Sequence, residues 1–435
     1  MQGPPCGAGF SCRYNRCILP NLRARISLQI AGVMILAAVA PLALAQTHQG
    51  TSTVIVMPFV NESKAPGVDW LSEACSEILL ERMQVPGLYL IDRDERVYAF
   101  DRAGVPATVR STRATVFRVA EQLSADFVVM GSYKVEANSY RASAEVLEVK
   151  NLRLRPPVTV SGQLQDFVAL QTSLAWNLLK GMPNPPHMTA EQFAKAAPPI
   201  RLDVFENFMR GVVSTSRPQK IRYFKEALKA DPDYAEAAFQ LGKVYYESHD
   251  YEQAITWLTK VPKDDPEAGE ATFLLGMAAY NHGDMNRAYT AFNTLIARLP
   301  LTVVYNNLGV VDARRGRRAA ALESFSKAVS ADPNDADYRF NLAVAEFKSG
   351  DNVAAMKQLR EELQLRPTDA EAKTFLDAIV RGAAFSVATG GTSGATQARV
   401  PIERIKRNYD EASYRQIEMQ IQNLQQQVQK PPNQK

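Results

Sequence analysis

The sequence predicts an α/β domain followed by an all-α superhelical array of stacked helix pairs. Two observations support this fold class. Strand and helix patterns alternate over residues 51–182, which is typical of an α/β domain. Beyond residue 200, a proline recurs at intervals of 33 or 34 residues, and such a fixed period is typical of helix-pair repeats. These prolines are Pro232, Pro266, Pro300, Pro333 and Pro367.

Residues 1–45 have the pattern of a secretory signal peptide. They hold four arginines and no acidic residue, then an apolar run, ISLQIAGVMILAAVAPLALA, that ends in Ala43-Leu44-Ala45. A run of this length could also span a bilayer as an uncleaved inner-membrane anchor. Pro41 and the small-x-small ending favour cleavage after Ala45. We therefore expect export across the inner membrane to the periplasm or the outer membrane.

The charge balance argues against a nucleic-acid-binding protein. The chain has 50 basic and 46 acidic residues, and the four leader arginines account for the whole excess. Proteins that bind nucleic acid depend on a basic surplus. Three of the four cysteines also lie in the leader, so the exported chain would keep only Cys75 and could form no internal disulfide.

The α/β pattern of residues 51–182 consists of short apolar strands and amphipathic helices. The expected strands are 53–59, 87–92, 126–135, 139–149 and 158–162, and the expected helices are 69–83, 107–123 and 164–182.

This order resembles the N-terminal TolB-like domain of bacterial envelope proteins. The resemblance rests on VIVMPFVNES at the first strand, PGLYLIDR at the second and AEQLSADFVVMGSY at the third. It implies a periplasmic or envelope-associated assembly factor and supplies no catalytic activity.

The sequence predicts a protein that is not an enzyme and that has no catalytic, cofactor-binding or metal site. It has neither a phosphate-binding glycine loop nor a Gly-x-Ser-x-Gly elbow. Cys75 lies on the apolar stripe of a helix, which favours a core residue over a nucleophile. His249 and His282 fall at turns between repeat helices and lack carboxylate or thiolate partners, so they make a weak metal site.

The repeats begin after a proline-rich stretch, residues 183–200, which we interpret as a semi-rigid linker with one short helical segment. Each unit has a Gly or Ala on its first helix and a small residue followed by a bulky one on its second. A small contact residue lets two helices approach closely, and proline ends the second helix. Five units, the first degenerate, and a capping helix fill residues 201–382. The units are 201–234, 235–268, 269–301, 302–335 and 336–369.

In period and residue type the array closely resembles the tetratricopeptide repeat. That resemblance implies that the first helices line a concave groove that binds protein partners. The groove residues would be Phe239, Lys243, Tyr246, Phe273, Met277, Tyr280, Asn306, Val310, Arg314, Phe340, Phe347 and Lys348. Any one of these side chains could instead pack between neighbouring repeats.

The Lys/Asn clamp that some members of the family use for a peptide carboxylate is missing. Phe239, Lys243, Phe273 and Met277 stand at the matching positions. We therefore expect the groove to take an apolar or amphipathic segment rather than a free carboxyl terminus.

Beyond the repeats, residues 383–400 are small and polar and predict a flexible linker. Residues 401–430 carry apolar residues at three- and four-residue spacing, which predicts an amphipathic helix. This helix could be a solvated tail, could mediate binding or self-association, or could fold back into its own or a neighbour's groove.

Together these features predict a non-enzymatic envelope scaffold. The repeat groove would bind a protein partner, and the α/β domain would be a second interaction module. Two alternatives remain open at this point: a self-assembling component of an outer-membrane export or pilus-type machine, and a small-molecule-binding α/β domain regulated through the repeats.

Overall fold

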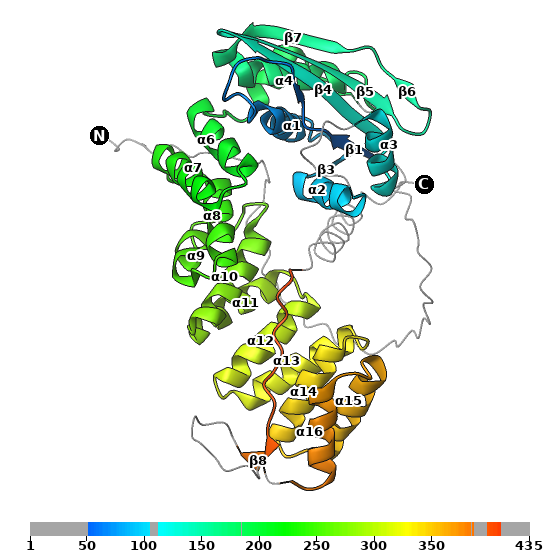
Figure 1. The fold of residues 1–435 in the computed structure, drawn as a ribbon, viewed down its shortest axis with the longest axis vertical. Coiled ribbons are helices and arrows are strands. Elements are labelled where there is room, and N and C mark those ends of the chain that lie inside the picture. Colours follow the sequence, from blue (N-terminus) through cyan, green and yellow to red (C-terminus); the bar gives the residue numbers. More distant parts are fainter. Residues whose placement is uncertain (1–50, 105–111, 184, 384, 387–397, 410–435) are drawn as a thin grey trace, which may run out of the picture. The chain divides into compact units, whose positions relative to one another are not determined.

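The computed structural model describes residues 51–104, 112–183, 185–383, 385–386 and 398–409. The chain divides into two compact units, residues 1–209 and 210–435. They correspond to a mixed α/β region followed by a helical repeat array, as the sequence predicts (Figure 1). The expected signal peptide, and the expected cleavage after Ala45, lie outside the described residues.

The first unit contains a seven-stranded mixed sheet in the order β3-β1-β4-β5-β6, in which β2 also pairs with β4 and β7 with β5. Strand β1 is parallel to β3 and β4, whereas β4 and β5 form a long antiparallel pair. The strands are β1 (Ser52–Val56), β2 (Val60–Asn61), β3 (Leu88–Ile91), β4 (Phe127–Glu136), β5 (Ser139–Glu148), β6 (Arg153–Leu154) and β7 (Val158–Gln163).

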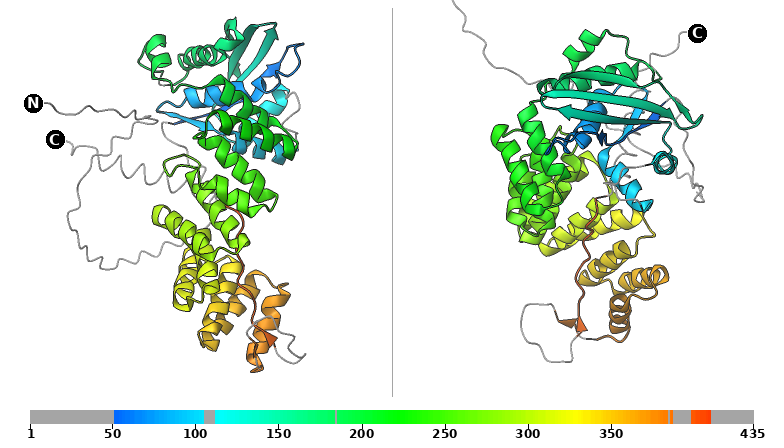
Figure 2. Two further views of the ribbon diagram at one scale, coloured as in Figure 1. Left: turned by 90° about the vertical axis from the view of Figure 1, so that its left-hand side faces the viewer. Right: turned by 45° about the horizontal axis from the view of Figure 1, so that its top comes forward.

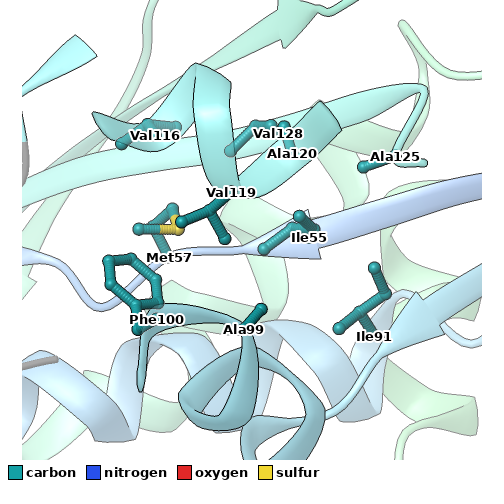
Figure 3. Close-up of a cluster of buried hydrophobic side chains, with 10 residues drawn as sticks. All are labelled: Ile55, Met57, Ile91, Ala99, Phe100, Val116, Val119, Ala120, Ala125 and Val128. Carbon is teal, nitrogen blue, oxygen red and sulfur yellow. The ribbon is translucent and has the colours of Figure 1, made fainter. Parts of the chain in front are cut away.

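Two helices, α2 (Arg93–Arg102) and α3 (Arg113–Gln122), cover one face of this sheet. Side chains from β1, β3 and β4, such as Ile55, Ile91 and Val128, pack there against Phe100 and Val119 (Figure 3). Alternate residues of a strand point to opposite faces, so the apolar runs of β1 and β4 can fill a core on both sides.

The other face packs against α1 (Leu71–Arg82) and α4 (Phe167–Leu179), which follows the short 3-10 helix Leu164–Asp166. The Tyr140 ring meets Phe167 edge-on at 5.2 Å. Its hydroxyl lies 3.3 Å from the Cys75 sulfur and accepts from Gln171 Nε2 at 2.6 Å. Cys75 is fully buried, which confirms it as a core residue.

Helix α2 has no counterpart among the helices that the sequence predicts, because only Arg96, Ala99 and Phe100 of its residues are buried. A local signal was nevertheless present, since Asp92 caps the helix by accepting from the Glu95 amide at 2.8 Å. The Arg96 guanidinium donates to the Val56 carbonyl at 2.6 Å and to the Glu73 carboxylate at 2.5 Å. This buried arginine joins α2 to both β1 and α1.

The proline-rich stretch contains the short helical segment that the sequence predicts, and this segment packs on the α/β unit. The segment is helix α5 (Ala190–Ala196), which begins in a capping box formed by Thr189 and Gln192. Phe193 is buried, and Arg82 donates to the Pro198 carbonyl at 2.6 Å. Residues within and just after α5 therefore pack on the α/β unit instead of standing free.

The repeat array is a stack of helix pairs, and the boundary between the two units, at residue 210, falls within its first helix (Figure 2). The pairs are α6 (Leu202–Val213) with α7 (Arg217–Ala230), α8 (Ala235–Glu247) with α9 (Tyr251–Leu258), α10 (Ala268–His282) with α11 (Met285–Arg298), α12 (Thr302–Arg314) with α13 (Arg318–Ala331), and α14 (Ala336–Lys348) with α15 (Asn352–Leu365). Helix α16 (Ala370–Val380) packs on α15 at the position expected for the capping helix.

Glycine sets the close approach of the two helices within a pair. A Cβ built on Gly276 would lie 2.6 Å from the Phe292 ring, and one on Gly309 would lie 2.7 Å from Phe325. The degenerate first unit has the same contact, because a Cβ on Gly211 would lie 2.5 Å from Phe224. The small residue of the first helix therefore receives the bulky residue of the second, as the repeat pattern predicts.

Candidate protein-binding groove

The first helices of the repeats hold a segment from the C-terminal part of the chain, residues 398–409, which we call the strap. The strap runs without helix along α14 and α12, visible as the red trace in Figures 1 and 2. It starts at β9 (Ala398–Arg399), which pairs in parallel with β8 (Phe385–Ser386). Val400 packs with the cluster of α14, α15 and α16, whereas Tyr409 reaches the Phe273 ring on α10 at 5.4 Å.

Two asparagine side chains each hold both main-chain groups of one strap residue. Asn341 accepts from the Arg404 amide at 2.6 Å and donates to the Arg404 carbonyl at 2.7 Å. Asn307 accepts from the Lys406 amide at 2.9 Å and donates to the Lys406 carbonyl at 2.8 Å. Both asparagines are fully buried. Their amides satisfy the strap backbone as a neighbouring strand would, without regard to its side chains.

Asn306 strengthens this arrangement from the same helix as Asn307. Its Nδ2 donates to the Arg404 carbonyl at 3.0 Å, and its Oδ1 accepts from Asn341 at 2.7 Å. The three amides thus form one connected buried network, which holds each of them in a single orientation.

Carboxylates surround the two strap cations that the asparagines hold. The Arg404 guanidinium pairs with Asp369 at 2.7 Å, Glu371 at 2.9 Å and Asp337 at 3.2 Å. The Lys406 ammonium pairs with Asp335 at 2.8 Å and Asp337 at 2.7 Å.

These contacts shift the ionisation of the carboxylates. Burial would raise the pKa of Asp369, but hydrogen bonds from Arg404 and the Ala372 amide outweigh it and lower the pKa to about 2. Burial likewise opposes ionisation of Asp337, whose pKa is nevertheless held well below its usual range by Arg366 and Lys406. Burial would lower the pKa of Lys406, yet its two aspartate partners raise it. The site therefore favours the charged forms of Asp369, Asp337 and Lys406.

The opposite side of the strap is anchored by one acid and by apolar groups. Glu403 is buried and accepts from the Lys348 ammonium at 2.6 Å. Ile405 packs on a cluster that includes Val310 and Phe325. Since alternate residues of an extended strand point to opposite sides, Arg404 and Lys406 face the carboxylates while Glu403 and Ile405 face away from them.

Of the groove residues predicted from sequence, seven lie against the strap or pack in a cluster with one of its residues. Asn306 and Lys348 bond to it as described, and the Phe340 ring lies 3.5 Å beneath the Arg404 guanidinium. Phe273 contacts Tyr409, and Phe347 packs in the cluster that includes Val400. Val310 and Tyr280 pack in the cluster that includes Ile405.

The other five predicted residues have different surroundings. Met277 accepts from Asn307 through its sulfur at 3.5 Å. Lys243 pairs with Glu270 at 3.2 Å and lies 5.0 Å from the Phe239 ring. Tyr246 lies 6.0 Å from the ring of Tyr251, and the Arg314 side chain is exposed.

Sequence reasoning missed Asn307, Asn341, Asp335, Asp337 and Asp369. A signal for four of them was present in the repeat itself. Asn307 and Asn341 occupy the same position in successive units, 34 residues apart, and so do Asp335 and Asp369. Comparison of polar residues between units, and not only of the small and bulky ones, would have found both pairs.

One expectation about the C-terminal segment needs correction. Residues 401–409, the start of the expected amphipathic helix, are not helical, and residues 410–430 lie outside the described residues. The strap is an extended segment with charged side chains in ion pairs, and the expected apolar or amphipathic partner segment stays a prediction. The asparagines bind the backbone groups that a helix would use internally, so the groove selects an extended chain.

The described residues contain neither a cluster of metal ligands nor a membrane-spanning helix. Within those ranges, no group of three or more His, Cys, Asp or Glu residues is arranged to hold a metal ion. In the same part of the chain, no helix is long and apolar enough to cross a bilayer.

Three family models described as tetratricopeptide repeat match the second unit. They cover residues 221–271, 270–302 and 306–370. The chain contains tetratricopeptide repeats. Such repeats suggest a protein–protein interaction scaffold.

Solved structures with partial similarity include further repeat proteins. A crystal structure of MamA is 25% identical over 39% of this chain and 95% of its own length, with a TM-score of 0.36. YrrB, a tetratricopeptide repeat protein described as having an unusual peptide-binding site, is 18% identical over 43% of this chain and 96% of its own, with a TM-score of 0.38.

The LpoB C-terminal domain from Salmonella enterica is 16% identical over 26% of this chain and 84% of its own, with a TM-score of 0.24. No curated protein matches the chain.

Proposed function

We propose that this protein is a non-enzymatic scaffold of the bacterial envelope whose repeat groove binds an extended segment of a partner protein. The observation that carries the proposal is the strap. Its backbone is held at Arg404 and Lys406 by paired asparagine hydrogen bonds, a mode of binding that any extended peptide can share. The seat of the chain's own segment supports a groove that binds an extended peptide.

The two units would act as separate interaction modules. The α/β unit resembles a TolB-like domain in its strand motifs, and its buried Cys75 offers no reactive group. We assign it a second contact with another envelope component. The leader pattern of residues 1–45 supports export, and mass spectrometry of the protein from the envelope fraction should give a chain that begins at Gln46.

Site-specific photocrosslinking in the cell would test the groove. A crosslinking side chain replaces Arg314, an exposed residue on α12, in the full chain, and a matched version replaces Asn293, which is exposed on the outer helix α11. We expect position 314 to capture one defined envelope protein that position 293 does not. The same capture should fail when Asn307 and Asn341 are changed to Ala, while the double change N286A/N293A on α11 leaves it intact. Identical crosslinks from both positions would contradict the proposal.

Self-assembly is a second candidate, favoured by one specific observation. Each copy carries both a groove and a segment that fits it, so the same contacts made between copies would join them. Light scattering of the exported chain over a range of concentrations would test this. A mass that rises with concentration, and falls to a monomer when Arg404 and Lys406 are changed to Ala, would support it.

A further inference from the structure

Two successive repeats carry the same pair of binding residues. In one, Asn307 holds the Lys406 backbone and Asp335 pairs with its ammonium. In the next, Asn341 holds the Arg404 backbone and Asp369 pairs with its guanidinium. The two asparagines are 34 residues apart, which is one repeat period, and so are the two aspartates. The strap residues that they bind are two positions apart. Each asparagine–aspartate pair therefore binds one strap residue, and the two residues lie on the same side of the strand. Asn306 and Asp337 connect the two positions, because Asn306 also donates to the Arg404 carbonyl and Asp337 pairs with both cations.

The preceding repeat and the capping helix lack this asparagine–aspartate pair. The groove therefore has two such binding positions within the described residues. The positions equivalent to Asn307 and Asp335 in the preceding repeat are Leu274 and Leu301. The position after Asn341 in the series is Phe375, on the capping helix. A ligand strand can thus place its two cations in only one register.

The negative charge of the acidic cluster favours a ligand that places cations beside it. Asp335, Asp337, Asp369 and Glu371 come together at the first turns of α14 and α16, and Arg366 pairs with Asp337 at 2.8 Å. Glu362 is fully buried, lies 3.9 Å from Arg404, and has its pKa raised to about 7 by burial and by the charge of Asp369. Removing the strap cations would leave these carboxylates facing one another.

The residues that point away from the cluster have defined partners as well. Glu403 is buried against Lys348, and Ile405 packs on an apolar cluster. Four consecutive residues thus meet four different environments: a cation, an acidic pocket over an aromatic ring, an apolar surface and a second acidic pocket.

We propose that the groove is specific for an extended segment with the order acid, Arg, apolar, Lys, and that residues 403–406 are a resident ligand that such a partner segment displaces. The inference rests on the proposed function, since it names the class of segment that the groove binds. The resident ligand is linked to its own groove, so a partner competes with a segment at an effective concentration on the order of millimolar. The partner segment then binds only when the strap leaves the groove, so the two segments compete.

A competition experiment on the full exported chain would test this. The double change Arg404→Ala and Lys406→Ala weakens the resident ligand, and the matched control changes two exposed cations of the same strap, Arg399→Ala and Arg407→Ala. The probe is a fluorescent peptide of residues 399–409. A second peptide carries the R404A/K406A changes, and a third carries the R399A/R407A changes.

We expect the R404A/K406A chain to bind the unaltered peptide and the R399A/R407A peptide equally tightly. It should bind the R404A/K406A peptide at least about tenfold more weakly. The unaltered chain and the R399A/R407A chain should bind the unaltered peptide at least about tenfold more weakly than the R404A/K406A chain does.

The other outcomes separate this inference from the proposed function. If the R404A/K406A chain binds all three peptides equally, the groove still takes a peptide but the order of side chains is irrelevant, and the inference fails alone. If the unaltered chain binds as tightly as the R404A/K406A chain, the strap is no resident ligand and the inference fails. If the folded R404A/K406A chain binds no peptide, the inference and the proposed function fail together.

A second version of the experiment does not depend on the variant folding. A protease site is placed within residues 387–397 of the otherwise unaltered chain, and the strap is cut from the folded protein. Exchange of the released strap for the labelled peptide supports the inference, with faster exchange expected at high salt because ion pairs weaken there. Equal exchange for the R404A/K406A peptide would overturn it.

Discussion

The Arg404 guanidinium carbon lies 3.5 Å from the centroid of the Phe340 ring, while the guanidinium nitrogens pair with three carboxylates. An arginine face stacked on a buried ring is held in one plane, which aims its donors at the acidic cluster. Asn341, the residue after Phe340, holds the backbone of the same arginine. One turn of α14 therefore binds both the main chain and the side chain of Arg404.

We predict that Phe340→Leu weakens binding of the strap peptide to the R404A/K406A chain by about 3- to 10-fold, because leucine fills much of the space but has no π face. Fluorescence anisotropy measures the effect. Phe224→Leu is the control, since Phe224 is equally buried but belongs to the first repeat. An equal loss in both variants would mean that softening of the repeat core, and not the ring under Arg404, causes the change.

Gly276→Ala should lower the free energy of unfolding by about 1–3 kcal/mol, because the added methyl would lie 2.6 Å from the Phe292 ring and force the helices apart. Urea unfolding monitored by circular dichroism measures the loss.

The double variant Gly276→Ala, Phe292→Leu should recover part of this stability. The fifth repeat has this combination naturally, with Ala343 on the first helix and Leu359 on the second. Losses that simply add in the double variant would show that the glycine and the ring do not meet.

Glu362 should make stability depend on pH. Its pKa is raised from the usual 4.5 to about 7 by burial and by Asp369, so the folded chain keeps a proton that the unfolded chain has released. Stability from this group is present below about pH 4.5 and is lost as the pH rises toward 7. Glu362→Gln should therefore raise the free energy of unfolding at pH 8 by about 1–2 kcal/mol, and by clearly less at pH 5.

Urea unfolding at the two pH values measures this difference. Asp369 has the opposite sign, because its lowered pKa stabilises the fold above about pH 4 and this contribution disappears only as the pH falls toward 2. It therefore does not mask the effect between pH 5 and 8. An E362Q gain that is the same at both pH values would contradict the assignment.

In the folded exported chain, residues 46–435, Cys75 should not react with a maleimide at pH 8. Burial raises the pKa of its thiol to about 12, and the side chain is fully enclosed between α1 and the sheet. Labelling should follow global unfolding, so it should be complete within minutes in 8 M urea and at least about a hundredfold slower in buffer. Rapid labelling of the native chain, measured by mass spectrometry, would instead indicate an accessible thiol.

Local patterns were sufficient to predict the repeat helices and most of the sheet. Helices α8 to α15 follow the 33- or 34-residue period, because each depends on its own apolar stripe and on the glycine contact of its pair. Helix α2 was missed because its apolar side is narrow, and Arg96, one of its three buried residues, is charged. Arg96 is stable there because the Val56 carbonyl and the Glu73 carboxylate accept hydrogen bonds from its guanidinium. That arrangement depends on tertiary packing.

The strap also differs between what its local sequence predicts and what tertiary contacts decide. By itself, the spacing of Ile402, Ile405 and Tyr409 favours a helix, and its charges suggest only a solvated surface. In the structure, Asn307 and Asn341 take the backbone hydrogen bonds that such a helix would make, and carboxylates on other helices take the charges. Contacts across about 60 to 100 residues of sequence decide this conformation.

By itself, the sequence determined the fold class and the repeat period, because these depend on patterns repeated within a few turns of chain. That the first helices line a groove was implied by the resemblance to the tetratricopeptide repeat. Only the tertiary structure decided what fills that groove. The choice between a helix and an extended strand at residues 401–409 depends on hydrogen-bond and charge partners that the repeats bring together in space, and local spacing does not encode them.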